Sequence, residues 1–335
     1  MSNSKKDLFE NLLKDEKIDL SYLRSRVHPL NQIPAYVKRE DELGFGISGY
    51  KKRKYLSLIP CIEKQNVDEV LILATAQSNH LLSVVQILKE KQIPLKVFLA
   101  SDKKNFEGNF LLSSLFLNDN QIEWLGRKSW DLLKAKADEY QKNQYLSGKR
   151  VFILEPGAFQ NESILGTSSL ALDIIRNEEE INKSFDHIFM DVGSGLTAIV
   201  TLLVFAYLEK TAHFHFVLLA DEEEVFLSKI DKVSAVLKDL VGQNPIDALP
   251  SFTLHKSLIA PSFGSTNAQL FKTIRDFALK EGVLLDPIYN AKLFYTSEIL
   301  IRTHQYNGHK LIIHSGGGLA LNGFTDALVR TLKKS

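Results

Sequence analysis

The sequence predicts an α/β fold in which parallel sheets are covered by helices on both faces. Short runs with the composition of strands alternate with longer stretches of helical spacing along the chain. Most of these runs are apolar throughout, as expected for strands that are buried on both sides. The chain has 335 residues, of which 44% are hydrophobic, and this suffices for a substantial core.

The predicted elements follow one another in a regular order, without an internal repeat or a low-complexity linker. A helix is expected to begin near Tyr50, before the first strand. The predicted strands cover residues 69–76, 95–100, 150–155, 187–192, 213–220 and 310–315. The other predicted helices lie near residues 79–92, 106–118, 128–143, 163–177, 196–209, 222–242, 266–281, 290–305 and 319–333.

Composition and charge exclude several classes of protein. Lysine and arginine number 41 and aspartate and glutamate 40, so the chain lacks the positive field that non-specific nucleic-acid binding requires. The longest apolar run, residues 195–208, is shorter than the roughly 20 residues of a membrane-spanning helix and indicates a buried helix instead. We therefore expect neither nucleic acid nor a membrane as a partner.

Cysteine usage and the amino end bear on the cellular compartment. Cys61 is the single cysteine of the sequence, which excludes an internal disulfide and is compatible with a reducing cytosol. The first 17 residues lack the apolar core of a signal peptide, which argues against export. No paired cysteine or histidine spacing indicates a metal site. We expect a cytoplasmic protein without a bound metal.

Four cations stand in a row at the start of the helix predicted near Tyr50: Lys51, Lys52, Arg53 and Lys54. At about 100° per residue, Lys51 and Lys52 lie over the apolar face, Arg53 lies opposite and Lys54 lies at the margin. A solvated charge run is the simpler interpretation. However, cations at a helix N-terminus oppose the helix dipole, which favours the neutral, nucleophilic form of a lysine at this place.

Two glycine-rich segments, 191–200 and 312–323, each follow an apolar strand and open a helix. Such turns let backbone N–H groups converge on an anion, although each could also be an ordinary tight turn. The first segment loosely fits a dinucleotide-binding fingerprint, with Asp221 as a ribose partner. Asp221 follows Gly193 by 28 positions instead of about 20, and a dinucleotide leaves the lysine cluster unexplained.

Five segments, taken in order, carry a resemblance to a known family. They are "YVKREDELGFGISGYKKRK" (36–54), "TAQSNH" (75–80), "VGSGLT" (192–197), "LLDPIYNAK" (284–292) and "HSGGGLALNG" (314–323). Over residues 30 to 330 the chain resembles the pyridoxal-phosphate enzymes that comprise 1-aminocyclopropane-1-carboxylate deaminase and D-cysteine desulfhydrase. The resemblance implies a fold of the tryptophan-synthase-β type (fold type II), with two doubly wound open-sheet domains. It implies a large cofactor-binding domain of residues 1–53 and 161–335, a smaller inserted domain of 54–160, and a homodimer.

The resemblance also implies a role for each residue of these motifs. The family's Gly-Gly-Asn-Lys motif falls on residues 48–51, which makes Lys51 the lysine that binds pyridoxal 5'-phosphate as a Schiff base. Asn79 would bind the ring hydroxyl, and Tyr289 would lie near the ring as a further catalytic residue. The catalytic Ser78 and its neighbours Gln77, Asn79 and His80 would receive the substrate carboxylate, although His80 could instead only orient this turn. The phosphate would be held by Gly193, Ser194, Gly195, Leu196 and Thr197.

Departures from the deaminase pattern bear on the reaction. A carboxylate beside the pyridine nitrogen strengthens the cofactor as an electron sink, whereas a neutral hydroxyl does not. Where the deaminase pattern has Glu and Leu, this chain has Asn290 and Ser315, which would contact or support the ring nitrogen. Phe263 replaces a Tyr whose hydroxyl serves the opening of the cyclopropane ring.

These departures favour β-elimination from D-cysteine, giving pyruvate, ammonia and sulfide, over deamination of 1-aminocyclopropane-1-carboxylate, giving 2-oxobutanoate and ammonia. In either reaction a small amino acid is the substrate. Two remoter alternatives remain at this point: an NAD-binding oxidoreductase, and a protein that binds pyridoxal phosphate without catalysis. Altered residues at Ser48, Tyr50, Phe263 and Asn290 keep the second one open.

Overall fold

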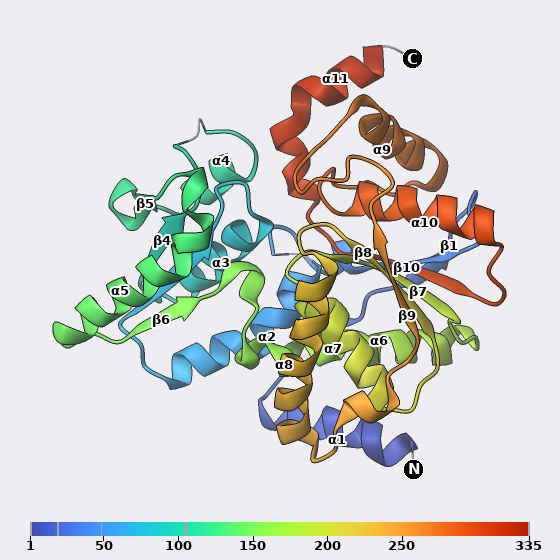
Figure 1. Cartoon of the computed structure of the whole chain (residues 1–335), viewed down its shortest axis with the longest axis horizontal. Coiled ribbons are helices and arrows are strands. Elements are labelled where there is room, and N and C mark those ends of the chain that lie inside the picture. The colour runs from blue at the N-terminus through green and yellow to red at the C-terminus, as the bar shows by residue number, and fades with distance from the viewer. Residues whose placement is uncertain (1, 19, 48, 104–105, 334–335) are drawn as a thin grey trace.

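The chain folds around two separate β-sheets (Figure 1). The computed structural model describes residues 2–18, 20–47, 49–103, 106–333, so Ser48 lies outside the described residues. One sheet has six strands in the order β1-β2-β10-β7-β8-β9, and the other has four in the order β5-β4-β3-β6. The predicted α/β class, with two open sheets, is confirmed.

All six predicted strands are present, within two residues of their predicted ends. Four further strands were not predicted, namely β1, β2, β5 and β9. The strands are β1 (Val27–Pro29), β2 (Tyr36–Arg39), β3 (Glu69–Ala74), β4 (Leu95–Leu99), β5 (Ile122–Trp124), β6 (Val151–Leu154), β7 (His187–Val192), β8 (His213–Leu218), β9 (Phe252–Lys256) and β10 (Lys310–His314). All strand pairs are parallel except β1 with β2.

The predicted helices are present, but two of them begin as 3-10 helices. The helix predicted near 128–143 begins as a 3-10 helix, Arg127–Leu132, and the one predicted at 319–333 is a 3-10 helix, Gly318–Phe324, followed by α11. The α-helices are α1 (Ser2–Asp15), α2 (Tyr50–Lys64), α3 (Asn79–Glu90), α4 (Gly108–Ser114), α5 (Leu133–Leu146), α6 (Ile164–Ile181), α7 (Leu196–Tyr207), α8 (Glu223–Val241), α9 (Ala268–Glu281), α10 (Asn290–His304) and α11 (Thr325–Lys333).

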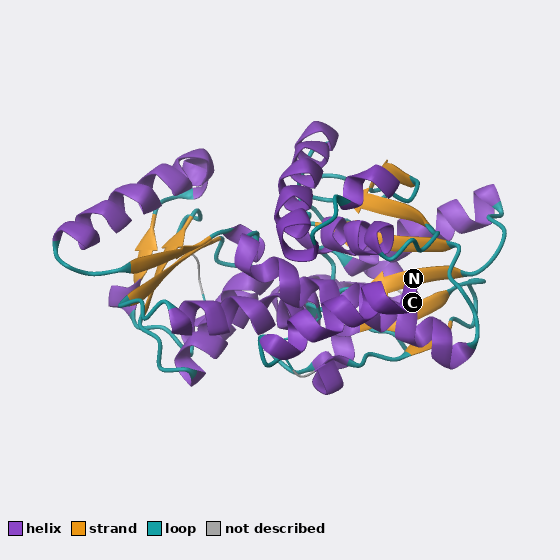
Figure 2. Ribbon diagram, turned by 90° about the horizontal axis from the view of Figure 1, so that it is seen from below, coloured by secondary structure: helices purple, strands orange, loops and turns teal. Residues whose placement is uncertain are grey.

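Each sheet is buried on both faces, which explains why its central strands are apolar throughout. Along β7, Met190 points to the side covered by α6 and α7, and Phe189 points to the side covered by α9 and α10. Along β3, Ile72 faces α2 and α3, and Leu73 faces α5. Figure 2 shows helices on opposite sides of both groups of strands.

Helix α2 runs between the two sheets (Figure 1). Its first turns pack on α6 beside the six-stranded sheet, whereas Leu58 and Ile62 belong to the core of the four-stranded one. The helix therefore continues across the domain boundary predicted at residues 53 and 54, and the assignment of 1–53 and 161–335 to one domain stays a prediction. Among the described residues, no helix is long and apolar enough to cross a membrane.

Candidate active site

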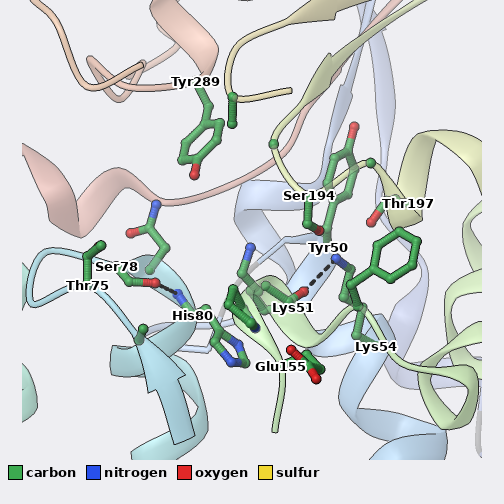
Figure 3. Close-up of a pocket in the computed structure, with 18 of the residues that line it drawn as sticks. Tyr50, Lys51, Lys54, Thr75, Ser78, His80, Glu155, Ser194, Thr197 and Tyr289 are labelled. Carbon is green, nitrogen blue, oxygen red and sulfur yellow. Dashed lines mark hydrogen bonds between the residues drawn. The ribbon is translucent and has the colours of Figure 1, made fainter. Parts of the chain in front are cut away.

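A cavity of about 730 Å³ lies where strands of both sheets end (Figure 3). In open α/β sheets ligands bind outside the carboxyl ends of the strands, because the loops there converge. Here the lining comes from the first turn of α2, from the segments after β3, β7 and β10, and from the loop before α10. The predicted site residues that line it are Lys51, Ser78, Asn79, His80, Gly193, Ser194, Gly195, Thr197, Phe263, Tyr289 and Ser315.

Lys51 reaches this cavity because α2 begins in direct contact with the end of β10. Gly49, just before the helix, has φ +61°, and a Cβ there would lie 1.8 Å from the carbonyl oxygen of Ser315. Only glycine permits that approach. Burial lowers the pKa of Lys51, partly offset by the nearby carboxylates of Asp191 and Asp286. The neutral amine is thereby favoured, as the position of this lysine in the sequence predicts.

The other three cations of the cluster are not a solvated charge run. Arg53, placed opposite the apolar face in the sequence analysis, is fully buried and ion-paired with Glu40 and Asp173, because α6 and the amino-terminal segment cover that side of α2. Lys52 donates to the carbonyl oxygen of Leu43 and does not line the cavity.

Lys54, by contrast, was missed as a site residue. It lines the cavity, is 3% exposed and donates to the carbonyl oxygen of Gly157 at 2.9 Å. Burial and the positive charge of Lys51 lower its pKa well below the ordinary value. The signal was its spacing of three residues from Lys51, which puts both amines on the same side of a helix.

The turn after β7, residues 193–197, leaves the N-terminus of α7 uncapped; we call it the β7 turn. Gly195 is the N-cap residue, at φ +90°, and offers no side chain to the N–H groups of the first helical turn. The hydroxyl of Thr197 is buried and has no hydrogen-bond partner among the described residues. Unpaired donors at a helix N-terminus form a seat for an anion. Leu196 itself points into the core and does not line the cavity.

The turn after β3, residues 75–80, has the opposite arrangement; we call it the β3 turn. The hydroxyl oxygen of Ser78 accepts hydrogen bonds from the N–H groups of His80 at 3.0 Å and Leu81 at 3.4 Å, so it caps α3. Asn79 accepts from the side chain of Asn109 at 2.7 Å, and its amide nitrogen lies against Gly317 after β10. The amide group of Asn79 is thus held between Asn109 and the segment after β10.

His80 and Gln77 are placed differently from each other. His80 lines the cavity, is 2% exposed, and its Nδ1 lies 2.9 Å from the hydroxyl of Tyr55. Burial, with the charges of Lys51 and Lys54, lowers the pKa of His80 well below its usual value, so the ring is neutral. Gln77 does not line the cavity; its side chain holds the backbone of Glu107 and Asn109.

A wall of the cavity is aromatic. The ring of Tyr289 lies against Gly193, and Phe263 packs on it at 6.1 Å between ring centroids. Burial, with the charges of Asp191 and Asp286, raises the pKa of Tyr289 far above neutrality, so its hydroxyl keeps its proton. This wall therefore lies against the first residue of the β7 turn.

At the end of β10, Ser315 lines the cavity and Asn290 lies behind it. The side-chain oxygen of Asn290 accepts from the N–H of Ser315 at 2.9 Å, and its amide donates to the carbonyl oxygen of Gly316 at 2.7 Å. Asn290 is fully buried and does not line the cavity, so it supports the turn. Asp191, at the end of β7, also lines the cavity and was not predicted as a site residue.

Asp221, the carboxylate that the dinucleotide alternative requires, is ion-paired with Lys229, and the same lysine donates to the carbonyl oxygen of Ser194 at 3.0 Å. The pair of Asp221 and Lys229 therefore supports the β7 turn. Among the described residues, no group of three or more histidine, cysteine, aspartate or glutamate side chains is arranged to hold a metal ion.

Known proteins resemble this chain along most of its length. A family model described as pyridoxal-phosphate dependent enzyme matches residues 19–316. D-cysteine desulfhydrase of Serratia proteamaculans is 26% identical over 85% of this chain and 87% of its own. 1-Aminocyclopropane-1-carboxylate deaminase of Pseudomonas syringae pv. syringae is 24% identical over 94% of this chain and 98% of its own.

A solved structure shares the fold of this chain. The crystal structure of a homologue of 1-aminocyclopropane-1-carboxylate deaminase superposes with a TM-score of 0.75 at 24% identity, covering 93% of this chain and 98% of that one. The two-sheet architecture is therefore shared along nearly the whole length of both proteins. With the family match over residues 19–316, it follows that the chain belongs to the family of pyridoxal-phosphate dependent enzymes.

Proposed function

We propose that this enzyme catalyses β-elimination from a small amino acid, with D-cysteine as the leading substrate. One observation carries the proposal: the amine of Lys51 shares one cavity with the uncapped β7 turn and the β3 turn. In Figure 3 the β3 turn lies to one side of Lys51, and Ser194 and Thr197 lie to the other. An amine, an anion seat and a second set of N–H groups are what a bound cofactor and an amino-acid carboxylate require.

The residues of the cavity fit pyridoxal phosphate. The uncapped N-terminus of α7 and the hydroxyl of Thr197, which has no partner among the described residues, match a phosphate dianion. The amide nitrogen of Asn79 faces Gly317 and can donate to the ring hydroxyl, since Asn109 donates to the side-chain oxygen of Asn79. When bound, the cofactor supplies an electron sink that stabilises negative charge on the α-carbon of the substrate.

The chain's own groups then carry the proton transfers and the binding. Lys51, whose pKa is lowered by burial, holds the cofactor and accepts the proton from the α-carbon. The β3 turn binds the substrate carboxylate through its backbone N–H groups and the hydroxyl proton of Ser78, whose oxygen already serves the cap. D-cysteine and one water are converted to pyruvate, ammonia and hydrogen sulfide.

Side chains on the substrate side favour elimination over opening of a cyclopropane ring. Phe263 lines the cavity beside Tyr289 and brings no hydroxyl, so one group that ring opening would use is absent there. Elimination needs mainly a base at the α-carbon and a thiolate that can leave. Deamination of 1-aminocyclopropane-1-carboxylate is the second candidate, supported by the likeness to deaminases along 94% of the chain.

The experiment compares Lys51→Ala with its neighbour Lys52→Ala. Purified wild-type protein should be yellow and should release pyruvate and sulfide from D-cysteine. Lys51→Ala should be colourless and inactive, whereas Lys52→Ala should keep both properties, because Lys52 does not line the cavity. Pyruvate release by Lys51→Ala at the wild-type rate would refute the proposal.

A parallel assay separates the two candidate reactions. D-cysteine and 1-aminocyclopropane-1-carboxylate are supplied separately, and sulfide and 2-oxobutanoate are measured. Predominant 2-oxobutanoate would establish the deaminase instead.

We also propose that the enzyme works as a homodimer in the cytoplasm. The resemblance implies the dimer, and large apolar side chains such as Tyr22 and Phe45 are exposed on the single chain. Light scattering should give twice the chain mass of 37.9 kDa. A single cysteine suits a reducing compartment, and cell fractionation would test the location.

A further inference from the structure

Asp191 is a buried carboxylate that the proposed function does not yet use. It stands near the end of β7, in an otherwise apolar run, two residues before the β7 turn. It is 7% exposed, it lines the cavity, and its Oδ1 is buried without a hydrogen-bond partner among the described residues. A carboxylate in such a place costs several kcal/mol in solvation unless something compensates for it.

The groups around Asp191 come from three other parts of the chain. The side chain of Ser315, after β10, faces Asp191 and acts to lower its pKa, while its hydroxyl donates to the side-chain oxygen of Asn290 at 3.3 Å. Burial raises the pKa of Asp191 to about 6, and the nearby charge of Asp286 acts in the same direction. The titratable groups that face it are Tyr50, Lys51 and Lys54 on α2, and Asp286 and Tyr289 before α10.

The other carboxylates near the cavity are already paired. Glu155 and Asp221, which line it, are bound to Lys134 and Lys229. Asp286 accepts from the backbone N–H groups of residues 288, 289 and 290 and from the side chain of Asn290. Among the described residues of the cavity lining, Asp191 is therefore the carboxylate that lacks a cationic hydrogen-bond partner.

We propose that Asp191 is the carboxylate that faces the cofactor's pyridine nitrogen and keeps that nitrogen protonated. This inference rests on the proposed function, because it requires the phosphate in the β7 turn and Lys51 as the anchor. The cofactor ring must extend from that turn toward Lys51, and Asp191 lies close to both. The proton is shared between the ring nitrogen and the carboxylate, and none is consumed.

This assignment changes the interpretation of Asn290 and Ser315. Both are neutral where the deaminase pattern has Glu and Leu, which predicts a weak electron sink. A carboxylate supplied from β7 replaces the missing glutamate, because an adjacent negative charge favours the protonated pyridine. The cofactor then remains a strong electron sink, although the carboxylate that protonates it comes from a different strand.

The test measures the ring nitrogen directly in the cofactor-loaded protein. Wild type, Asp191→Asn and the control Glu155→Gln, at a lining carboxylate that is paired with Lys134, are loaded with pyridoxal phosphate that carries ¹⁵N in the ring, and the ¹⁵N chemical shift is recorded at about pH 8. Wild type and Glu155→Gln should show the shift of a protonated ring, and Asp191→Asn that of an unprotonated one. An unprotonated ring in wild type, or a protonated ring in Asp191→Asn, would overturn the inference. So would the same change in both variants.

The result is separable from the proposed function. A wild-type protein that stays colourless with pyridoxal phosphate would sink the function and the inference together. A yellow, active protein with an unprotonated ring would sink the inference alone. If Asp191→Asn does not fold, the wild-type spectrum decides, because it must show the protonated ring at about pH 8.

Discussion

The β3 turn and the β7 turn both lead from a parallel strand into a helix, yet their N–H groups are treated in opposite ways. At the β3 turn the hydroxyl oxygen of Ser78 occupies two N–H groups of α3. At the β7 turn the N-cap is Gly195. In the described part of the chain no side chain caps the first turn of α7, and the hydroxyl of Thr197 has no partner.

The capped and the uncapped turn suit two different kinds of anion. The uncapped turn has its full set of donors available for a dianion such as a phosphate, which is held for the life of the cofactor. The capped turn has fewer N–H groups available and suits a single carboxylate that must be released after each turnover. A turn that binds permanently can depend on its ligand for stability, whereas a turn that must also be stable when empty needs a cap of its own.

The largest effect is expected when the β7 turn receives a negative charge. In Ser194→Asp the new carboxylate stands one residue before the N-cap Gly195, where it should repel the phosphate and compete for the N–H groups of the turn. Each lost charge-assisted hydrogen bond is worth about 1.5–3 kcal/mol, so the dissociation constant of the cofactor should rise by roughly 100-fold or more. The thermal midpoint of the cofactor-free protein should not fall, because a negative charge beside a helix N-terminus interacts favourably with the helix dipole. Cofactor titration followed by absorbance measures the first effect, and tight binding by Ser194→Asp would contradict the assignment of this turn.

A smaller effect concerns the carboxylate that precedes the uncapped turn. The pKa of Asp191 is raised to about 6, so the folded chain without cofactor binds a proton there more tightly than the unfolded chain does. Protonation of Asp191 therefore stabilises the fold at low pH, and this stabilisation is lost as the pH rises through 6. Asp191→Asn should therefore be more stable than cofactor-free wild type above pH 6, by on the order of 1–3 kcal/mol. The difference should disappear below about pH 4. Urea unfolding at several pH values measures it, and a gain that does not depend on pH would exclude titration of Asp191 as the cause.

Removing one donor from the β7 turn should have a still smaller effect. Thr197→Val replaces a buried, unpartnered hydroxyl by a methyl group of the same size, so the cofactor-free protein should be as stable as wild type or more stable. The cofactor should dissociate about tenfold more readily, since about 1.5 kcal/mol of a charge-assisted bond is lost. Equal affinity of both proteins would mean that the hydroxyl does not contact the phosphate.

The fold was largely predictable because its central strands are buried on both faces and read as continuous apolar runs. The four strands that were missed lack this signal. β1 and β2 have three and four residues, β5 is half-buried, and β9 is an edge strand that mixes exposed and partly buried positions. Short or edge strands need neither length nor continuous apolarity, so nothing in their composition distinguishes them from loops.

The parts of the site that carry glycine turns or ordered motifs could be predicted from the sequence. The side chains whose positions depend on residues far away in the sequence could not. The burial of Arg53 depends on Asp173, which lies 120 positions further along the chain. Lys54 meets the carbonyl oxygen of Gly157, which lies 103 positions further along the chain. One feature of the sequence could have indicated Asp191: it is a charged residue in an apolar strand, just before a glycine turn. A charge in such a place indicates a functional residue at the end of the strand.

The smallest expected effect distinguishes capping from substrate binding at the β3 turn. Ser78→Ala removes the cap of α3 and should lower the free energy of unfolding by about 1 kcal/mol. The yellow colour should remain, because the proposed phosphate seat is at the other turn. Ser78→Asp restores a cap but brings a charge that repels the substrate carboxylate, so stability should recover while KM for D-cysteine rises further than in Ser78→Ala. Urea unfolding and steady-state kinetics on the two variants measure these quantities. If stability and KM rise and fall together in both variants, the turn does not bind the carboxylate and Ser78 serves the helix alone.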